Sequence, residues 1–168
     1  MKTSATIFLT SMVAMTQAQN FKSLEEEIII NAPAEAVWNV LVDFENWENW
    51  NPFIIKAKGK AEVGEKLENV FRNGDKDMVI KPKLLKVDQN EELVWIGRLI
   101  MPGIFDGRHG FRIEEIGPNQ VRFVNYENFK GILSGMIMKK IGEDTKANFN
   151  KMNQALKAEV EQQMLAKN

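Results

Sequence analysis

The only histidine, His109, and the glutamate Glu127 are the side chains best suited to acid–base chemistry in this sequence. They stand in two successive apolar runs, "GRHGFRIEEIG" and "VRFVNYENFKG", which are joined through the turn-forming letters "GPNQ" and predict a β-hairpin. An imidazole beside a carboxylate can exchange a proton with a bound carbonyl compound. The two residues are therefore the catalytic candidates, provided that the hairpin brings them together.

The register of this hairpin decides whether the two side chains meet. In one register His109 faces Asn128, whereas a shift of one residue, for instance through a bulge at Gly117, pairs His109 with Glu127. A His–Glu pair that only fixes the geometry at the rim of a cavity is the alternative to catalysis. We favour the shifted register because it gathers four apolar side chains on one face: Phe111, Ile113, Val121 and Phe123.

Other site chemistries find little support. A zinc site needs several cysteine or histidine ligands, and the chain has no cysteine and one histidine, so we expect no metal and no cofactor. Ser23 and Ser134 lack a histidine in any local pattern that would make either a nucleophile. The 22 basic and 23 acidic residues give a net charge of −1 without a basic cluster, which argues against nucleic-acid binding.

The segments that must position these residues predict a two-layer α+β domain. The isoleucine-rich run "SLEEEIIINA", residues 23–32, predicts a strand, and the following "APAEAVWNVLVDF" predicts a helix that starts at Pro33. Six further extended runs, divided by short turns, predict an antiparallel meander between Phe53 and Gly131. Pro82, inside the third run, predicts an edge position or a bulge.

A long helix is predicted from Glu143 onward, because apolar residues recur there at spacings of three and four opposite a charged face. This apolar face must lie on an apolar layer. It consists of Phe149, Met152, Leu156 and Val160. Methionines near the expected cavity openings either adapt to an apolar ligand or fill the core: Met101, Met136, Met138 and Met152.

One of the six runs carries a glycine between two large side chains. Trp95 and Leu99 share a strand face, and Gly97 between them either permits a bend or leaves room for a ligand. Three nearby arginines hold a carboxylate or phosphate head group if any of them points inward, and are solvated surface otherwise: Arg98, Arg108 and Arg112.

The stretch "DFENWENWNPF" places tryptophans among polar letters. Phe44, Trp47 and Trp50 recur at intervals of three, so one further helical turn points all three the same way before Pro52 ends it. Two interpretations stay open. The turn either staples the first helix to the sheet, or closes one end of a cavity and gives it an aromatic wall.

Three quoted segments carry a family resemblance: "INAPAEAVWNVLVDFENWENWNPFI", the pair "GRHGFRIEEIG" and "VRFVNYENFKGIL", and "FNKMNQALKAE". Together they resemble the START-like helix-grip superfamily, and within it the SRPBCC branch of polyketide cyclase/dehydrase and lipid-transport proteins. The resemblance covers Leu24 to about Gln163. It implies a seven-stranded antiparallel sheet curled around the C-terminal helix, two short helices between the first two strands, and a hydrophobic cavity between sheet and helix.

The resemblance implies binding or transport of a small hydrophobic ligand, such as a lipid, isoprenoid or polyketide-like molecule, with possible transient membrane contact. The alternatives are a cyclase/dehydratase-like enzyme that uses His109 and Glu127, and a module with a filled core and no ligand. A fold does not choose among such functions. The residues expected to bind the ligand are Trp47, Trp50, Phe53, Trp95, Leu99, His109, Phe111, Phe123, Glu127, Met136, Phe149 and Met152.

The N-terminus has the order of a signal peptide: the basic Lys2, the apolar run "ATIFLTSMVAM", and then small and polar letters that suit a cut between Ala18 and Gln19. The apolar run is too short to span a bilayer. We therefore expect residues 1–18 to be a signal peptide and residues 19–168 to form a single domain. Cleavage predicts a periplasmic or secreted protein, and retention of the segment a cytoplasmic one.

Overall fold

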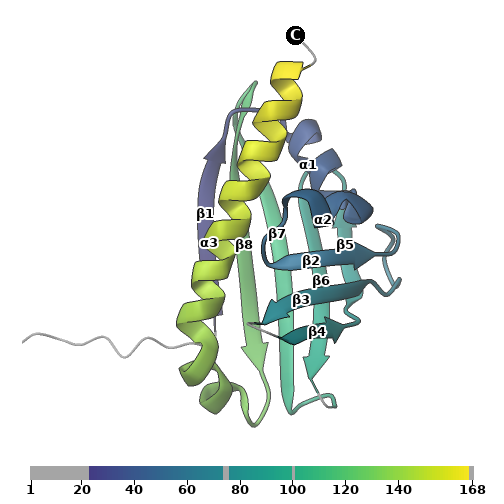
Figure 1. Ribbon diagram of the computed structural model, residues 1–168, viewed down its shortest axis with the longest axis vertical. Helices are drawn as coiled ribbons and strands as arrows, with labels where there is room; N and C mark the ends of the chain where they lie inside the picture. Colours follow the sequence, from purple (N-terminus) through teal and green to yellow (C-terminus); the bar gives the residue numbers. More distant parts are fainter. Residues whose placement is uncertain (1–22, 74–75, 100, 167–168) are drawn as a thin grey trace, which may run out of the picture.

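The computed structural model describes residues 23–73, 76–99 and 101–166, so the expected signal peptide lies outside the described residues. The α+β class, the short helices after the first strand and the long C-terminal helix are confirmed (Figure 1). The elements are β1 (Ser23–Ile30), α1 (Ala34–Val42), the 3₁₀ turn η1 (Phe44–Asn46), α2 (Trp47–Trp50), β2 (Ile54–Lys58), β3 (Glu68–Asn73), β4 (Lys76–Ile80), β5 (Lys83–Asp88), β6 (Glu92–Leu99), β7 (Phe105–Gly117), β8 (Gln120–Lys130) and α3 (Ser134–Ala166).

The strands form two antiparallel sheets, and the prediction of one seven-stranded sheet was wrong in this respect. Five strands lie in the order β1-β8-β7-β6-β5 and three in the order β2-β3-β4. The run around Pro82 contains two strands: β4 ends at Ile80, and β5 begins at Lys83 in the other sheet. Proline lacks the N–H that a ladder needs, so Pro82 separates the two strands and lies in neither.

The segment between β2 and β3 ties the two sheets together. The Leu67 N–H donates to the Pro82 carbonyl over 2.9 Å, and the Leu84 N–H donates to the Glu65 carbonyl over 2.8 Å. In one continuous curled sheet, β4 and β5 would pair with each other. Here the segment between β2 and β3 makes these backbone bonds to Pro82 and β5 instead. The three-stranded sheet is therefore a separate layer with a local attachment to β5.

All the helices and the small sheet lie on one face of the five-stranded sheet, which we call the inner face. Figure 1 shows α3 running along β1 and β8, while β2, β3 and β4 cross in front of β5, β6 and β7. The main core cluster joins both sheets with α1, α2 and α3 and includes Leu41, Trp47, Ile54, Trp95, Phe111 and Leu156. A smaller cluster lies nearer the start of α3 and consists of Leu24, Phe129, Met138 and Phe149.

Helix α3 begins at Ser134, earlier than the predicted start at Glu143. The glycines in this segment do not break the helix, because packing of the fully buried Met138 outweighs their low helix propensity. The Ser134 hydroxyl donates to the Gly131 carbonyl over 2.8 Å at the start of the helix. Among the described residues, no helix is long and apolar enough to cross a membrane.

The β7–β8 hairpin has the shifted register that the apolar pattern favoured. His109 pairs with Glu127, and the register changes by one residue between Glu115 and Gly117, so this prediction is confirmed. The four apolar side chains expected to share one face are all buried: Phe111, Ile113, Val121 and Phe123. The hairpin thus brings the two catalytic candidates to neighbouring positions on the inner face.

Candidate functional site

Trp47 is fully buried and staples the short helix α2 to α1, whereas its role as the wall of a cavity stays a prediction. Its indole N–H donates to the Leu41 carbonyl at the end of α1 over 3.0 Å, which staples α2 to α1. The same ring lies 6.2 Å from Trp95 and 6.3 Å from Phe111, centroid to centroid, and so forms an aromatic wall on the inner face. Trp50 is half-buried and packs edge-on against Trp47 at 5.7 Å.

His109 is buried among aromatic rings, with a side-chain exposure of 3%. Its ring lies 5.0 Å from Trp95, 4.6 Å from Phe111 and 4.8 Å from Phe149. The Nδ1 atom faces the Glu127 carboxylate at 3.5 Å. The structure therefore unites the two candidates at the inner face, beneath α3.

A chain of side-chain amides continues from His109 toward α3 and β1. The His109 Nε2 atom is 2.8 Å from the Asn125 oxygen, and the Asn125 amide donates to the Asn153 oxygen over 3.2 Å. The Asn153 amide donates to the Glu26 carbonyl over 3.1 Å. Sequence reasoning missed both asparagines, although Asn125 shares the inward strand face of Glu127 and Asn153 interrupts the apolar face of the long helix.

Two facing glycines lie beside Glu127, and neighbouring side chains pack over both of them: Glu127 over Gly107 and Ile80 over Gly97. The Glu127 carboxylate rests over Gly107 of β7, where any added side chain would overlap it. The neighbour of Gly107 across the ladder is Gly97 of β6, so two glycines lie opposite each other on the inner face. The Glu127 side chain keeps 17% exposure, so it is not fully enclosed by its neighbours.

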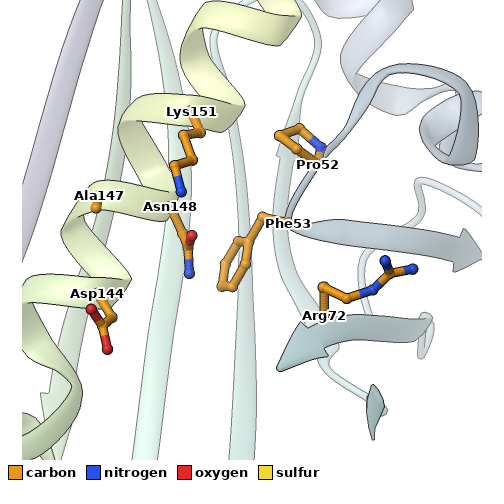
Figure 2. Close-up of a pocket in the computed structure, with 7 residues that line it drawn as sticks. All are labelled: Pro52, Phe53, Arg72, Asp144, Ala147, Asn148 and Lys151. Carbon is orange, nitrogen blue, oxygen red and sulfur yellow. The ribbon is translucent and has the colours of Figure 1, made fainter. Parts of the chain in front are cut away.

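A cleft of about 380 Å³ opens between α3 and the three-stranded sheet. Figure 2 shows Phe53 in the middle of the cleft, with residues of α3 on one side and Arg72 of β3 on the other. The Phe53 ring lies 5.2 Å from Phe71 and 6.4 Å from Phe149. Because Phe149 also contacts His109, ring contacts run from the cleft to the buried pair. The lining residues are Pro52, Phe53, Arg72, Asp144, Ala147, Asn148 and Lys151.

The mouth of the cleft carries charges of both signs. Arg72 is paired with Asp77 at 3.2 Å, and both side chains are about half exposed. Asp144 and Lys151 on α3 have no ion-pair partner among the described residues. The mouth is polar, whereas the rings behind it are apolar.

The expected ligand-binding residues divide into three groups. Two lie away from the buried rings: Leu99, at the end of β6, is 38% exposed, and Met136, on α3, is 67% exposed. Trp50, Phe53 and Glu127 are half-buried at the edges of the core. The remaining residues are buried on or against the inner face: Trp47, Trp95, His109, Phe111, Phe123, Phe149 and Met152.

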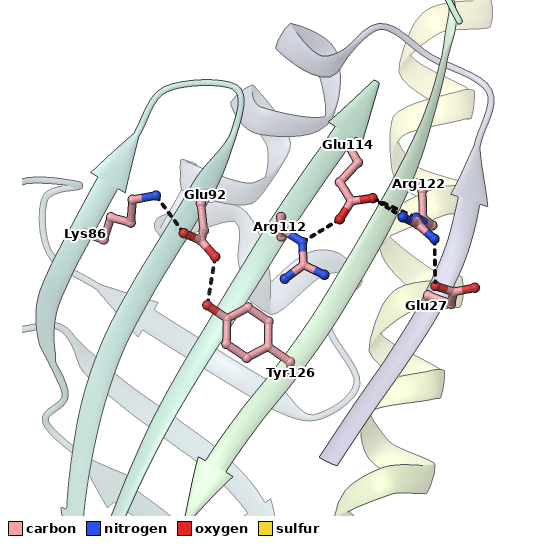
Figure 3. A network of polar contacts seen from close by, with 7 residues as sticks. All are labelled: Glu27, Lys86, Glu92, Arg112, Glu114, Arg122 and Tyr126. Atoms are coloured by element: carbon pink, nitrogen blue, oxygen red, sulfur yellow. Dashed lines mark hydrogen bonds and ion pairs between the residues drawn. The ribbon is translucent and has the colours of Figure 1, made fainter. Parts of the chain in front are cut away.

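The outer face of the five-stranded sheet is covered by paired charges (Figure 3). Lys86 binds Glu92 at 2.7 Å, and the Tyr126 hydroxyl donates to Glu92 over 2.8 Å. Glu114 accepts from both Arg112 and Arg122. Burial, followed by the bond to Glu92, raises the pKa of Tyr126 to about 12. The three arginines considered as head-group ligands alternate with inward residues and lie on this outer face: Arg98, Arg108 and Arg112.

The fold and the inner-face site define a helix-grip protein with a sheet and a long helix around an aromatic interior. Residues 22–161 match the family described as "Polyketide cyclase / dehydrase and lipid transport". The chain belongs to this family. No curated protein matches the sequence significantly.

Solved structures of low sequence identity share the fold. The aromatase/cyclase ZhuI from Streptomyces sp. R1128 is 14% identical with a TM-score of 0.68, and the match covers 84% of this chain and 94% of that one. A START superfamily protein from Mycobacterium smegmatis is 20% identical with a TM-score of 0.66, covering 83% and 97%. Norcoclaurine synthase from Thalictrum flavum is 16% identical with a TM-score of 0.66, covering 95% and 98%.

The charge network on the outer face predicts acid sensitivity. Hydrogen bonds from Arg122 and Arg112 lower the pKa of Glu114 in the folded protein. The ionised carboxylate therefore stabilises the fold at pH values above its unfolded-state pKa of about 4.3. This contribution is lost as the pH falls through the folded-state pKa. Glu114→Gln should lower the free energy of unfolding at pH 7 by less than about 1 kcal/mol, because solvent screens this partly exposed group, and should have a smaller effect at pH 3. Glu115→Gln is the control, and equal effects of both variants at pH 7 would contradict the assignment.

The buried amide chain predicts a larger cost. Asn125→Ala leaves the His109 Nε2 atom and the Asn153 oxygen without partners, and each unsatisfied buried group costs about 1–3 kcal/mol. Urea unfolding should show that the free energy of unfolding falls by at least the cost of one such group, about 1–3 kcal/mol. Asn128→Ala, exposed on the same strand, should change the free energy of unfolding by less than about 0.5 kcal/mol. A similar small loss for Asn125→Ala would mean that the amide chain contributes little.

Proposed function

We propose that this protein binds a small hydrophobic molecule, of lipid, isoprenoid or polyketide-like kind, between the five-stranded sheet and α3. One observation carries the proposal: the cleft at Phe53 connects through Phe149 to His109 and Glu127, a polar pair in an aromatic interior. The link consists of contacts between packed rings, and a cleft beside an apolar interior that holds a few polar groups is typical of a ligand site.

Phe53 is suited to act as a gating residue, whose ring would have to rotate to let a ligand enter. It is half-buried and packs against both core clusters, so it lies at the junction between them. Rotation of its ring away from Phe149 would extend the cleft toward His109, and a ligand would then have to displace the side chains that pack over Gly107 and Gly97. The ligand would replace Phe53 as the apolar neighbour of Phe149, and burial of its surface would supply about 25 cal/mol per Å² before ordering costs.

The comparisons support the class of ligand. The family description names both cyclases and lipid transport. The Thalictrum flavum norcoclaurine synthase structure is a complex with dopamine and hydroxybenzaldehyde, which are small aromatic molecules. The fold of this chain is thus one in which other proteins hold such molecules.

The binding proposal is tested with the neutral fluorescent probe Nile red. Wild-type protein should bind it saturably. Phe53→Ala should increase the association rate at least threefold in stopped-flow measurements, because the ring that blocks entry is removed. Ile132→Ala, which shortens an exposed side chain between β8 and α3, is the control and should leave the rate unchanged. Native mass spectrometry with organic extraction then identifies any molecule that copurifies.

Two outcomes would count against the proposal. Absence of saturable binding to the wild type, together with a clean apo mass, would overturn hydrophobic ligand binding itself. An unchanged association rate in Phe53→Ala, with binding intact, would overturn the path through the cleft.

Proton transfer is a second candidate function, and the 3.5 Å approach of His109 Nδ1 to Glu127 is the observation that favours it. In this function the pair removes a proton from the carbon next to a bound carbonyl group and returns a proton to that carbon. The aromatic surroundings would exclude water from the exchange. No group other than the ligand and the pair is needed for this step.

Deuterium exchange tests the second candidate. In D2O the wild type should speed exchange of the α-protons of 2-decanone, followed by NMR, and His109→Ala and Glu127→Gln should each abolish the acceleration while Nile red still binds. Acceleration that survives in both variants would exclude the pair as the acid–base group. Absence of acceleration by the wild type would leave binding as the function.

A further inference from the structure

The amide chain beneath α3 has a fixed hydrogen-bond direction. A backbone carbonyl can only accept, so the Asn153 atom that faces the Glu26 carbonyl at 3.1 Å must be its amide nitrogen. The Asn153 oxygen therefore accepts from the Asn125 amide, which also lies 3.8 Å from the Met152 sulfur, a weak acceptor. The remaining Asn125 atom, its oxygen, faces His109 at 2.8 Å.

This direction fixes the tautomer of His109. Because the Asn125 oxygen can only accept, the His109 Nε2 atom must carry a hydrogen. In a neutral imidazole the Nδ1 atom is then bare, and it faces the Glu127 carboxylate at 3.5 Å. Two bare, electron-rich atoms at this distance repel each other, and a proton between them converts the repulsion into attraction.

We infer that His109 and Glu127 together carry one proton, on Nδ1 or on the carboxylate, and so form a neutral polar anchor, and that the interior ligand presents a neutral hydroxyl or carbonyl oxygen to it; this single proton of the pair is called the shared proton. The chain from Glu26 through Asn153 and Asn125 positions this anchor. The ligand class rests on the proposed function, whereas the shared proton does not. With its proton the pair can donate to a carbonyl oxygen or accept from a hydroxyl group.

Charged head groups fit this place poorly. The shared proton leaves the pair with no net charge, so a ligand carboxylate or ammonium group buried beside it would lack a counter-ion. The rings around His109 offer none, and the arginines of β7 lie on the outer face. At the mouth, Arg72 is already paired with Asp77, and Asp144 and Lys151, which are not paired with each other, place one charge of each sign at the cleft.

The shared proton is tested by NMR on ¹⁵N,¹³C-labelled protein at pH 7, and the single histidine makes the imidazole signals unambiguous. The Nε2 atom should be protonated. In addition, either Nδ1 should be protonated or the Glu127 ¹³Cδ shift should be that of a carboxylic acid, with Glu127→Gln as the assignment control. A bare Nε2, or a bare Nδ1 beside an ionised Glu127, would overturn the inference.

The ligand class is tested by competition of ten-carbon ligands against Nile red. Decan-1-ol and 2-decanone should bind at least tenfold more tightly than decanoate and decylammonium. Neutral molecules enter any apolar site more readily than charged ones, so the comparison with Glu127→Leu is decisive. This variant should reduce the ratio of the affinity for the neutral ligands to the affinity for the charged ligands at least fivefold. An unchanged ratio would overturn the anchor.

Glu127→Gln and Lys151→Met complete the test. If the wild-type pair is already neutral, Glu127→Gln should change the affinity for decanoate by less than threefold, and a rise of tenfold or more would show an ionised Glu127 and overturn the shared proton.

Preference for decanoate that is lost in Lys151→Met would place the head group at the mouth and overturn the ligand class. If no ten-carbon ligand and no Nile red binds, the proposed function fails with the ligand class, and the NMR result still decides the shared proton.

Discussion

A one-residue bulge between Glu115 and Gly117 determines which side chains of the β7–β8 hairpin meet on the inner face. Because side chains alternate along a strand, a slip of one residue would turn the whole set of β8 to the opposite face. The bulge thus places His109 beside Glu127 and directs Asn125 toward α3. The aromatic wall, the amide chain and the site over Gly107 all depend on this register.

Burial of the polar groups of the interior has a considerable free-energy cost. Burying a histidine, a carboxylate and two amides is unfavourable unless each finds a partner. The fold provides those partners from three elements, because β7 supplies His109, β8 supplies Asn125 and Glu127, and α3 supplies Asn153. An apolar core of the same volume would be simpler to stabilise, so the polar chain fits a role in recognition.

Much of the architecture could be predicted from periodicity. The strand of residues 23–30, the helix after Pro33 and the hairpin register follow from local patterns of apolar side chains. The split into two sheets could not be predicted in this way, because the "DMVIKPKLLKVDQN" run carries adjacent apolar residues on both sides of Pro82 and no clear alternation that would assign either half to a sheet. Which of the two sheets each half joins depends on contacts with distant residues.

The site was predicted in part. His109 and Glu127 stand out by residue type, whereas Asn125 and Asn153 resemble ordinary surface amides and become visible only when the strand and the helix are packed together. The exposure of Met136 has a similar origin. The helical period that buries Met138 turns Met136 outward, and the earlier start of α3 extends this period to both residues.

The separation of the two sheets at Pro82 has a mechanical consequence. The wall of the interior formed by β2, β3 and β4 shares no continuous ladder with the five-stranded sheet and is tied to β5 through the segment around Leu67. A tilt of this wall about the attachment would therefore leave every ladder bond of both sheets intact. Under the proposed function, such a tilt would widen the interior for a bulkier ligand, while the ladder between β7 and β8 would keep His109 beside Glu127.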